Sequence, residues 1–186
     1  MWNLKCSVAL LACLLPFAAN GQESGVKSLR GKPSTEQIIE ALNPGPETAG
    51  RPAKTRGLSL GGSGQAAAPV AGWTRALDLE VKFQFNSDQL TGDGAEVVER
   101  LGSALQAKEL SKVRTVTLEG HADATGDADY NRALSLRRAQ AVRNALAGKA
   151  GLPTDFKTIG KGSSDPADPA HPTDPVNRRV RVIVGG

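Results

Sequence analysis

Apolar and polar residues alternate without a break over residues 77–85. Every odd position from Leu77 to Phe85 is apolar, and every even position is polar. This alternation is typical of a β-strand that buries one face, so the segment predicts a strand. Shorter segments of similar character predict further strands at 113–120, 156–159 and 179–184.

Two other segments repeat their apolar residues with helical spacing. The first begins after Thr91 and fades near Leu110, and its apolar positions are Val97, Val98, Leu101 and Leu105. The second extends from Asp127 to Gly148; Asp127 or Asp129 can cap its start, and Gly148 can end it. The resulting order, βαβαββ, predicts an α/β sandwich in which one mixed sheet packs against two helices.

The first 21 residues predict a secretory signal peptide. Lys5 supplies the positive charge, an apolar run extends over 8–19, and small residues favour cleavage after Ala19 or Gly21. The run is shorter than the roughly 20 residues that a membrane span needs. We therefore expect a mature chain without a transmembrane segment.

Both cysteines of the chain, Cys6 and Cys13, lie within this predicted signal peptide. Its removal leaves a mature chain with no thiol for a disulfide or for metal ligation. Residues 10–13 loosely resemble a lipobox, so acylation of Cys13 is an alternative. An apolar stretch after Cys13, where a polar tether is expected, argues against that alternative.

Residues 22–75 predict a flexible tether that precedes a folded domain at 76–186. The tether is rich in glycine, proline, serine and alanine, as at 61–64. One short helix is predicted near 35–42, because residues 34–37 have capping-box spacing before an apolar run. Such a short helix is marginal alone. It either docks on the domain, binds a partner through Ile38, Ile39 and Leu42, or forms only transiently.

One arginine of the second long helix projects on its apolar side. At about 100° per residue, Arg138 falls near the middle of the arc that holds Leu134 and Val142. A lone desolvated charge costs several kcal/mol. Arg138 therefore either reaches the helix edge or binds a carboxylate, which the protein or a ligand supplies.

The turn at 121–126, between a strand and this helix, offers a protein partner for Arg138. Crevices of this kind are common ligand sites. Asp123 in the turn and Arg138, two turns into the helix, would form a pair of opposite charges. Such a pair suits a ligand that carries both an ammonium and a carboxylate group.

Seven short fragments follow one another along residues 83–180. They are Phe83-x-Phe85-x-Ser87-x-x-Leu90, Gly120-His121-Ala122-Asp123, Tyr130-Asn131, Leu134-Ser135, Arg138-Ala139, Gly160-Lys161-Gly162 and Asn177-Arg178-Arg179-Val180. In order and spacing they resemble the signature of OmpA-like C-terminal domains, a family that includes the peptidoglycan-associated lipoprotein and MotB. The resemblance covers about 110 residues, nearly all of the predicted domain.

The resemblance implies a periplasmic protein, associated with the cell wall and in some members with the outer membrane. It implies non-covalent binding of the peptidoglycan stem peptide through meso-diaminopimelate. Asp123 would engage the ammonium group of this residue, and Arg138 would engage its carboxylate.

The same resemblance implies supporting positions around these two residues. Thr125 and Asn131 stand where family members supply polar contacts, and Asn86 or Ser87 would line the same pocket. Arg178 would either add positive potential or be a solvated charge at the end of a strand.

The sequence argues against an enzyme and against a metal or other cofactor. His121 and His171 are the only histidines, and a zinc site needs three or four donors, whereas His121 with Asp123 makes a pair at most. Residues 127–131 begin like a calcium-binding loop, but Arg132 stands where glycine is required.

The charge of the chain does not indicate nucleic acid as a partner. The formal net charge is +4, and the basic residues are scattered without interleaved aromatic residues. The predicted signal peptide also directs the protein away from nucleic acid. Besides peptidoglycan, the remaining partner class is a cell-envelope protein that binds the tether.

Overall fold

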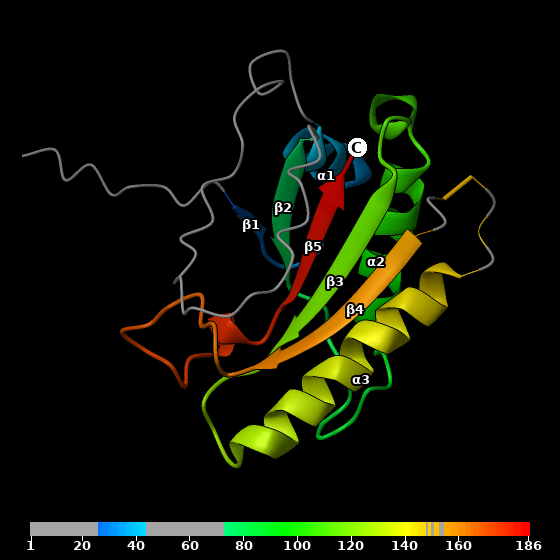
Figure 1. Cartoon of the computed structure of the whole chain (residues 1–186). Coiled ribbons are helices and arrows are strands. Elements are labelled where there is room, and N and C mark those ends of the chain that lie inside the picture. Colours follow the sequence, from blue (N-terminus) through cyan, green and yellow to red (C-terminus); the bar gives the residue numbers. More distant parts are fainter. Residues whose placement is uncertain (1–25, 44–72, 148, 150, 153–154) are drawn as a thin grey trace, which may run out of the picture.

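The computed structural model describes residues 26–43, 73–147, 149, 151–152 and 155–186. The strands are β1 (Lys27–Leu29), β2 (Thr74–Leu79), β3 (Thr115–His121), β4 (Asp155–Gly162) and β5 (Val180–Gly185). They form one mixed sheet in the order β1-β2-β5-β3-β4 (Figure 1). The pairs β1–β2 and β3–β4 are parallel, and β5 is antiparallel to both of its neighbours.

Three α-helices pack on one face of this sheet (Figure 1). They are α1 (Thr35–Leu42), α2 (Gly92–Leu105) and α3 (Ala128–Leu146), and two 3-10 turns are η1 (Lys108–Leu110) and η2 (Pro175–Asn177). The core lies between the helices and the sheet, and its strand residues include Leu77, Leu79, Val116, Leu118, Val180, Val182 and Val184. The α/β fold and the βαβαββ order predicted for 76–186 are confirmed.

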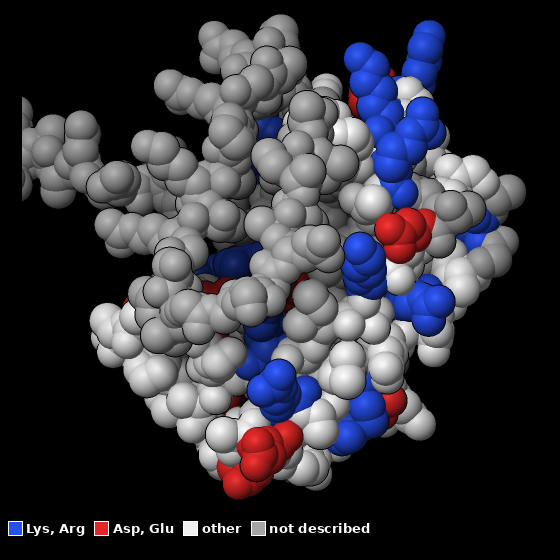
Figure 2. Space-filling model, in the orientation of Figure 1, with Lys and Arg blue, Asp and Glu red and all other residues white. Residues whose placement is uncertain are grey.

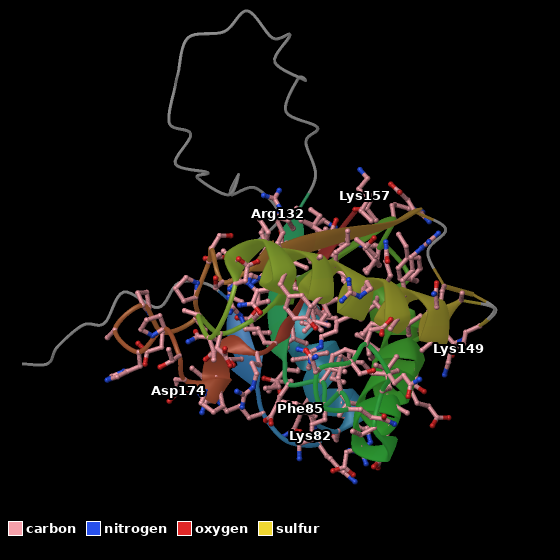
Figure 3. All side chains as sticks on the ribbon, turned by 90° about the horizontal axis from the view of Figure 1, so that it is seen from below. Lys82, Phe85, Arg132, Lys149, Lys157 and Asp174 are labelled. Atoms are coloured by element: carbon pink, nitrogen blue, oxygen red, sulfur yellow. The ribbon has the colours of Figure 1, made fainter. Side chains whose placement is uncertain are left out.

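The strand predicted over 77–85 ends earlier than expected. Leu79 pairs with Val180 on one side and with Leu29 on the other, and each of these residues is the terminal residue of its strand. Beyond Leu79 the chain therefore has no neighbouring strand with which to extend the ladder. Phe83 forms only an isolated bridge with Leu90. The side chain of Phe85 is fully exposed (Figure 3).

Residues 26–43 belong to the folded domain, although the sequence placed them in the tether. β1 pairs with β2, and Ile38 and Leu42 of α1 are completely buried in the shared core. The capping box of Ser34 and Gln37 is formed as predicted. Burial in the domain stabilises a helix that is too short to be stable alone. Ile38 and Leu42 are therefore not exposed for binding a partner, whereas Ile39 is only partly buried.

An arginine of α2 fastens the chain segment that leads into α1. Nη1 of Arg100 donates hydrogen bonds to the carbonyl oxygens of Lys32 and Pro33, over 3.1 and 3.0 Å. Lys32 in turn forms ion pairs with Asp93 and Glu96, at 2.9 and 2.7 Å. These contacts hold α1 against α2.

Close packing places α3 directly over β3 and β4. A Cβ atom at Gly120 would lie 2.0 Å from the backbone oxygen of Ser135, and one at Gly160 would lie 2.5 Å from that of Arg132. Only glycine fits at such an approach. Asp127 caps the start of α3 by accepting a hydrogen bond from the amide of Tyr130 at 2.8 Å. The predicted stop at Gly148 lies outside the described residues.

The surface charges of the described part are mixed. Figure 2 shows lysine and arginine side chains spread over the viewed face, with acidic side chains between them. No described helix combines the length and the apolar character that a membrane crossing requires.

Candidate functional site

A groove of about 850 Å³ opens between the loop after β2, the turn after β3, the first half of α3 and η2. Six of the seven predicted site residues line it: Asn86, Asp123, Thr125, Asn131, Arg138 and Arg178. The seventh, Ser87, stands beside the groove and contributes its backbone oxygen to Arg138. The fold therefore brings together residues that lie up to 92 positions apart in the sequence.

Asp123 is a buried carboxylate with two protein donors. Its Oδ1 accepts a hydrogen bond from the amide of Thr125 at 3.0 Å, and its Oδ2 accepts one from Nη1 of Arg178 at 2.7 Å. Burial acts to raise the pKa of Asp123, but these two donors outweigh it and hold the pKa below its ordinary value. Asp123 is therefore ionised at neutral pH.

Arg138 does not pair with Asp123 inside the protein. Its Nε donates to the backbone oxygen of Ser87 at 3.0 Å, and its guanidinium lies 5.0 Å from the ring centroid of Phe83. Such a cation–π contact favours the charged side chain. Burial and the charge of Arg178 lower the pKa of Arg138.

Within the part of the chain that the structure describes, no carboxylate forms an ion pair with Arg138. The prediction that Asp123 pairs with Arg138 is therefore wrong, because Asp123 pairs with Arg178 instead. A guanidinium has five N–H donors, and only the Nε donor of Arg138 bonds to a described residue. The remaining donors are available to a ligand in the groove.

Asn131 shapes the turn that presents Asp123. Its Nδ2 donates to the backbone oxygens of Asp123 and Thr125, over 3.3 and 2.8 Å, and its side chain is buried. Asn131 therefore fixes the turn from inside, whereas the exposed Thr125 lies at the rim of the groove.

Tyr130 also lines the groove, although it was not among the predicted site residues. Its hydroxyl donates a hydrogen bond to Oδ1 of Asn86, and its side chain is 43% exposed. Asn86 has a φ of 51°, a left-handed conformation that asparagine tolerates. The contact ties α3 to the loop after β2. The Tyr130-Asn131 fragment of the family signature was the available sequence signal for this role.

Arg178 faces the groove, and its position depends on a buried neighbour. Asn177 is completely buried; its Nδ2 donates to the oxygen of His171 at 2.9 Å, and its Oδ1 accepts from the amide of Asp168 at 3.0 Å. These bonds fold the proline-rich loop back on itself. Of the two roles left open for Arg178, the structure favours a charge that acts in the groove, through its bond to Asp123.

The groove thus places the ionised carboxylate of Asp123 near the guanidinium groups of Arg138 and Arg178, and Glu80 and Lys82 also line it. Charged groups of opposite sign in one concave site are chemically suited to a ligand that carries both an ammonium and a carboxylate. The apolar wall supplied by Phe83 and Leu134 suits the methylene groups of such a ligand.

The chain matches one family model and several known proteins. The OmpA family model matches residues 82–181. The chain is 37% identical over 116 residues to the outer-membrane lipoprotein YfiB of Pseudomonas aeruginosa, which covers 61% of this chain and 67% of that protein. It is 32% identical over 134 residues to the peptidoglycan-associated lipoprotein of Agrobacterium fabrum, with 69% and 73% covered.

Among solved structures, one match is the OmpA-like domain of FopA1 from Francisella tularensis subsp. tularensis SCHU S4. It is 27% identical, with a TM-score of 0.49, and the match covers 62% of this chain and 74% of that one.

Proposed function

Because the chain belongs to the OmpA family, we propose that its groove binds the stem peptide of peptidoglycan and anchors the protein to the cell wall without a covalent bond. The observation that carries the proposal is the state of Arg138. This guanidinium faces the groove, rests on Phe83 and forms no ion pair in the described part of the chain. A ligand carboxylate would complete its contacts.

The second contact of the ligand is with Asp123. At its free end, meso-diaminopimelate carries an ammonium and a carboxylate on one carbon atom, so the two charges suit Asp123 and Arg138 together. A carboxylate has about four acceptor positions, and Thr125 and Arg178 use two of those on Asp123. The ligand ammonium either joins Arg178 at this carboxylate or displaces it.

Binding without catalysis is part of the proposal. In this proposal Asp123 stays ionised and Arg138 stays protonated while they bind the ligand. The proposed role needs no bond to be broken. Incubation of purified peptidoglycan with the protein should release no soluble muropeptides. Release of such fragments would contradict the non-enzymatic role.

We further infer a location in the periplasm, at the cell wall. The relatives are named as an outer-membrane lipoprotein and as peptidoglycan-associated lipoproteins. Acylation at Cys13 and removal of a signal peptide concern residues outside the described part. Fractionation of cells that express the whole chain would test the location, and recovery in the cytoplasm would contradict it.

The direct test is co-sedimentation of the whole chain with insoluble peptidoglycan. Wild type should pellet with diaminopimelate-type peptidoglycan and much less with lysine-type peptidoglycan, which lacks the second carboxylate. Asp123→Ala and Arg138→Ala should each weaken binding by about tenfold or more, because each removes a charge-assisted contact.

Arg132→Ala is the matched control, since Arg132 is an exposed arginine of α3 that does not line the groove. It should bind as wild type does. Equal binding by all four proteins, with intact circular dichroism spectra, would show that the groove is not the binding site.

A further inference from the structure

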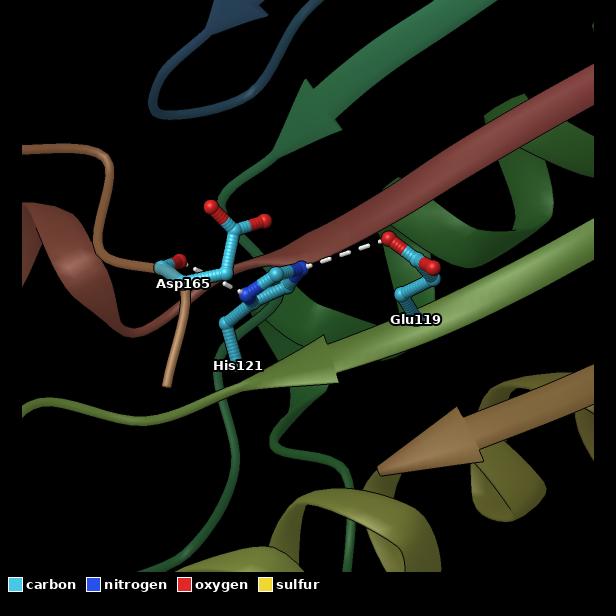
Figure 4. Close-up of side chains that lie close together, drawn as sticks. All are labelled: Glu119, His121 and Asp165. Carbon is cyan, nitrogen blue, oxygen red and sulfur yellow. Dashed lines mark hydrogen bonds and ion pairs between the residues drawn. The ribbon is translucent and has the colours of Figure 1, made fainter. Parts of the chain in front are cut away.

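A buried histidine at the end of β3 has one ring nitrogen with no hydrogen-bond partner. His121 is only 2% exposed, and its side chain lies on the sheet face opposite the helices (Figure 4). Its Nδ1 lies 3.1 Å from the backbone oxygen of Asp165. In the described part of the chain, its Nε2 makes no hydrogen bond.

The Asp165 contact determines which nitrogen carries the proton. A backbone oxygen can only accept, so Nδ1 of His121 is the donor, and in the neutral ring Nε2 presents a lone pair. That lone pair faces Oε2 of Glu119 at 3.7 Å (Figure 4). Two buried acceptors that face each other need a cation between them, because an unsatisfied buried acceptor is costly.

A third donor stands beside this pair. A carboxylate oxygen of Asp165 and the ligand atoms of Glu119 and His121 all lie within 4.8 Å of one another. In the sequence, His121 and Asp123 make only a pair of donors, which argues against a zinc site. The fold turns Asp123 into the groove and brings Glu119 and Asp165 to His121 instead.

Neighbouring cations orient both carboxylates. Nζ of Lys161 lies 3.7 Å from Oε1 of Glu119, on the side away from the histidine contact. Nη1 of Arg181 lies 3.1 Å from Oδ2 of Asp165. Metal-bound histidines commonly donate their second nitrogen to a backbone oxygen, and metal-bound carboxylates commonly have further polar partners. His121 has such a bond, Asp165 accepts a hydrogen bond from Arg181, and Glu119 forms an ion pair with Lys161.

We propose that Glu119, His121 and Asp165 form a binding site for a divalent transition-metal ion, with Zn²⁺ as the first candidate. Zinc bonds to imidazole nitrogen and carboxylate oxygen at about 2.0–2.2 Å, so one ion can span two donors that are 3.7 Å apart. The Asp165 side chain is 48% exposed, so an ion can reach the cluster from solvent on this side.

The bound ion would link β3 to the loop between β4 and η2. Glu119 and His121 belong to β3, whereas Asp165 belongs to the loop that continues to Arg178 in the groove wall. Zinc should therefore raise the unfolding temperature of the protein. The site is separate from Asp123 and Arg138, so its test does not depend on peptidoglycan binding.

The test is a calorimetric titration of the chelator-stripped whole chain with Zn²⁺. Wild type should bind one ion, and Glu119→Gln and Asp165→Asn should each weaken binding by at least about tenfold. Both substitutions keep the size of the side chain, so a circular dichroism spectrum like that of wild type is expected. The matched control is His171→Ala, because His171 is an exposed histidine that is paired with Asp168 at 2.8 Å.

X-ray absorption of the zinc complex identifies the ligands. The proposal expects nitrogen and oxygen neighbours at about 2.0–2.2 Å, whereas a sulfur shell near 2.3 Å would show ligation by Cys6 or Cys13 and overturn it. Absence of zinc binding, or loss of binding in His171→Ala but not in Glu119→Gln, would also overturn it. A proton would then occupy the position between His121 and Glu119.

Discussion

At the scale of single residues, the groove depends on which arginine reaches Asp123. Arg138 and Arg178 both line the groove, but only Arg178 bonds to the carboxylate, at 2.7 Å. Helical periodicity located Arg138 correctly on the inner side of α3. It could not predict whether Arg138 or Arg178 would pair with Asp123. That choice depends on the path of the loop before β5, which carries Arg178 to the groove.

Replacing Arg178 should shift the pH dependence of binding. The pKa of Asp123 lies below its ordinary value of about 3.9. Because the carboxylate is the charged form, its contribution to stability and to ammonium binding is present above that value and is lost as pH falls through the folded pKa. Arg178→Ala removes one donor and leaves the burial, so the pKa of Asp123 rises and binding is lost at a higher pH.

Co-sedimentation with peptidoglycan between about pH 3 and 7 measures this shift. At pH 7 the variant should still bind, since Asp123 remains ionised there. Peptidoglycan itself titrates in the same range, so Arg132→Ala serves as the reference for that effect. Identical pH profiles for Arg178→Ala and the reference would show that Arg178 does not control Asp123.

At the scale of elements, the position of α3 determines the geometry of the groove. Tyr130, Asn131 and Arg138 all project from this helix, and its distance from the sheet is limited by Gly120 of β3 and Gly160 of β4. The Asp127 cap and the apolar positions of α3 could be predicted from local spacing. Its close approach could not, since it depends on two strands that are separated from each other by the helix in the sequence.

Gly120→Ala should therefore lower the free energy of unfolding. The new Cβ would meet the backbone oxygen of Ser135 at 2.0 Å, so α3 must move away from β3. Overpacking of this kind typically costs about 1–3 kcal/mol. Urea unfolding followed by circular dichroism measures the change.

Gly92→Ala is the control with the opposite sign. Gly92 begins α2 and has nothing within 4 Å of a new Cβ, so alanine should stabilise the helix by up to about 1 kcal/mol. If both substitutions stabilised the protein equally, the close approach of α3 would not constrain the fold.

The end of β2 shows why strand patterning alone was insufficient. Alternation continues to Phe85, but pairing stops at Leu79, where both neighbouring strands reach their ends. The alternation also gave no indication of an ion-pair cluster. Asp78, on the face away from the core, pairs with Arg179 and Arg181 at 2.8 and 2.7 Å. The partners of Leu79 are Leu29 and Val180, which lie 50 and 101 positions away in the sequence, so no local pattern predicts where the pairing stops.

At the scale of the whole molecule, the folded domain is larger than the family match at 82–181. Residues 26–43 add β1 to the edge of the sheet and α1 to the core. Composition suggested a tether because glycine and proline surround this segment. The capping box and the four apolar residues after it were the correct signal, but only tertiary packing could decide whether they dock.

The contribution of α1 to stability can be measured with one buried and one half-buried residue. Leu42 is completely buried, so Leu42→Ala should lower the free energy of unfolding by about 2–5 kcal/mol. Ile39, on the same helix, is only partly buried, and Ile39→Ala should cost clearly less. Because α1 does not line the groove, peptidoglycan binding by the folded fraction should be unchanged. Equal and small effects of the two substitutions on urea unfolding would instead mean that α1 is not part of the cooperative core.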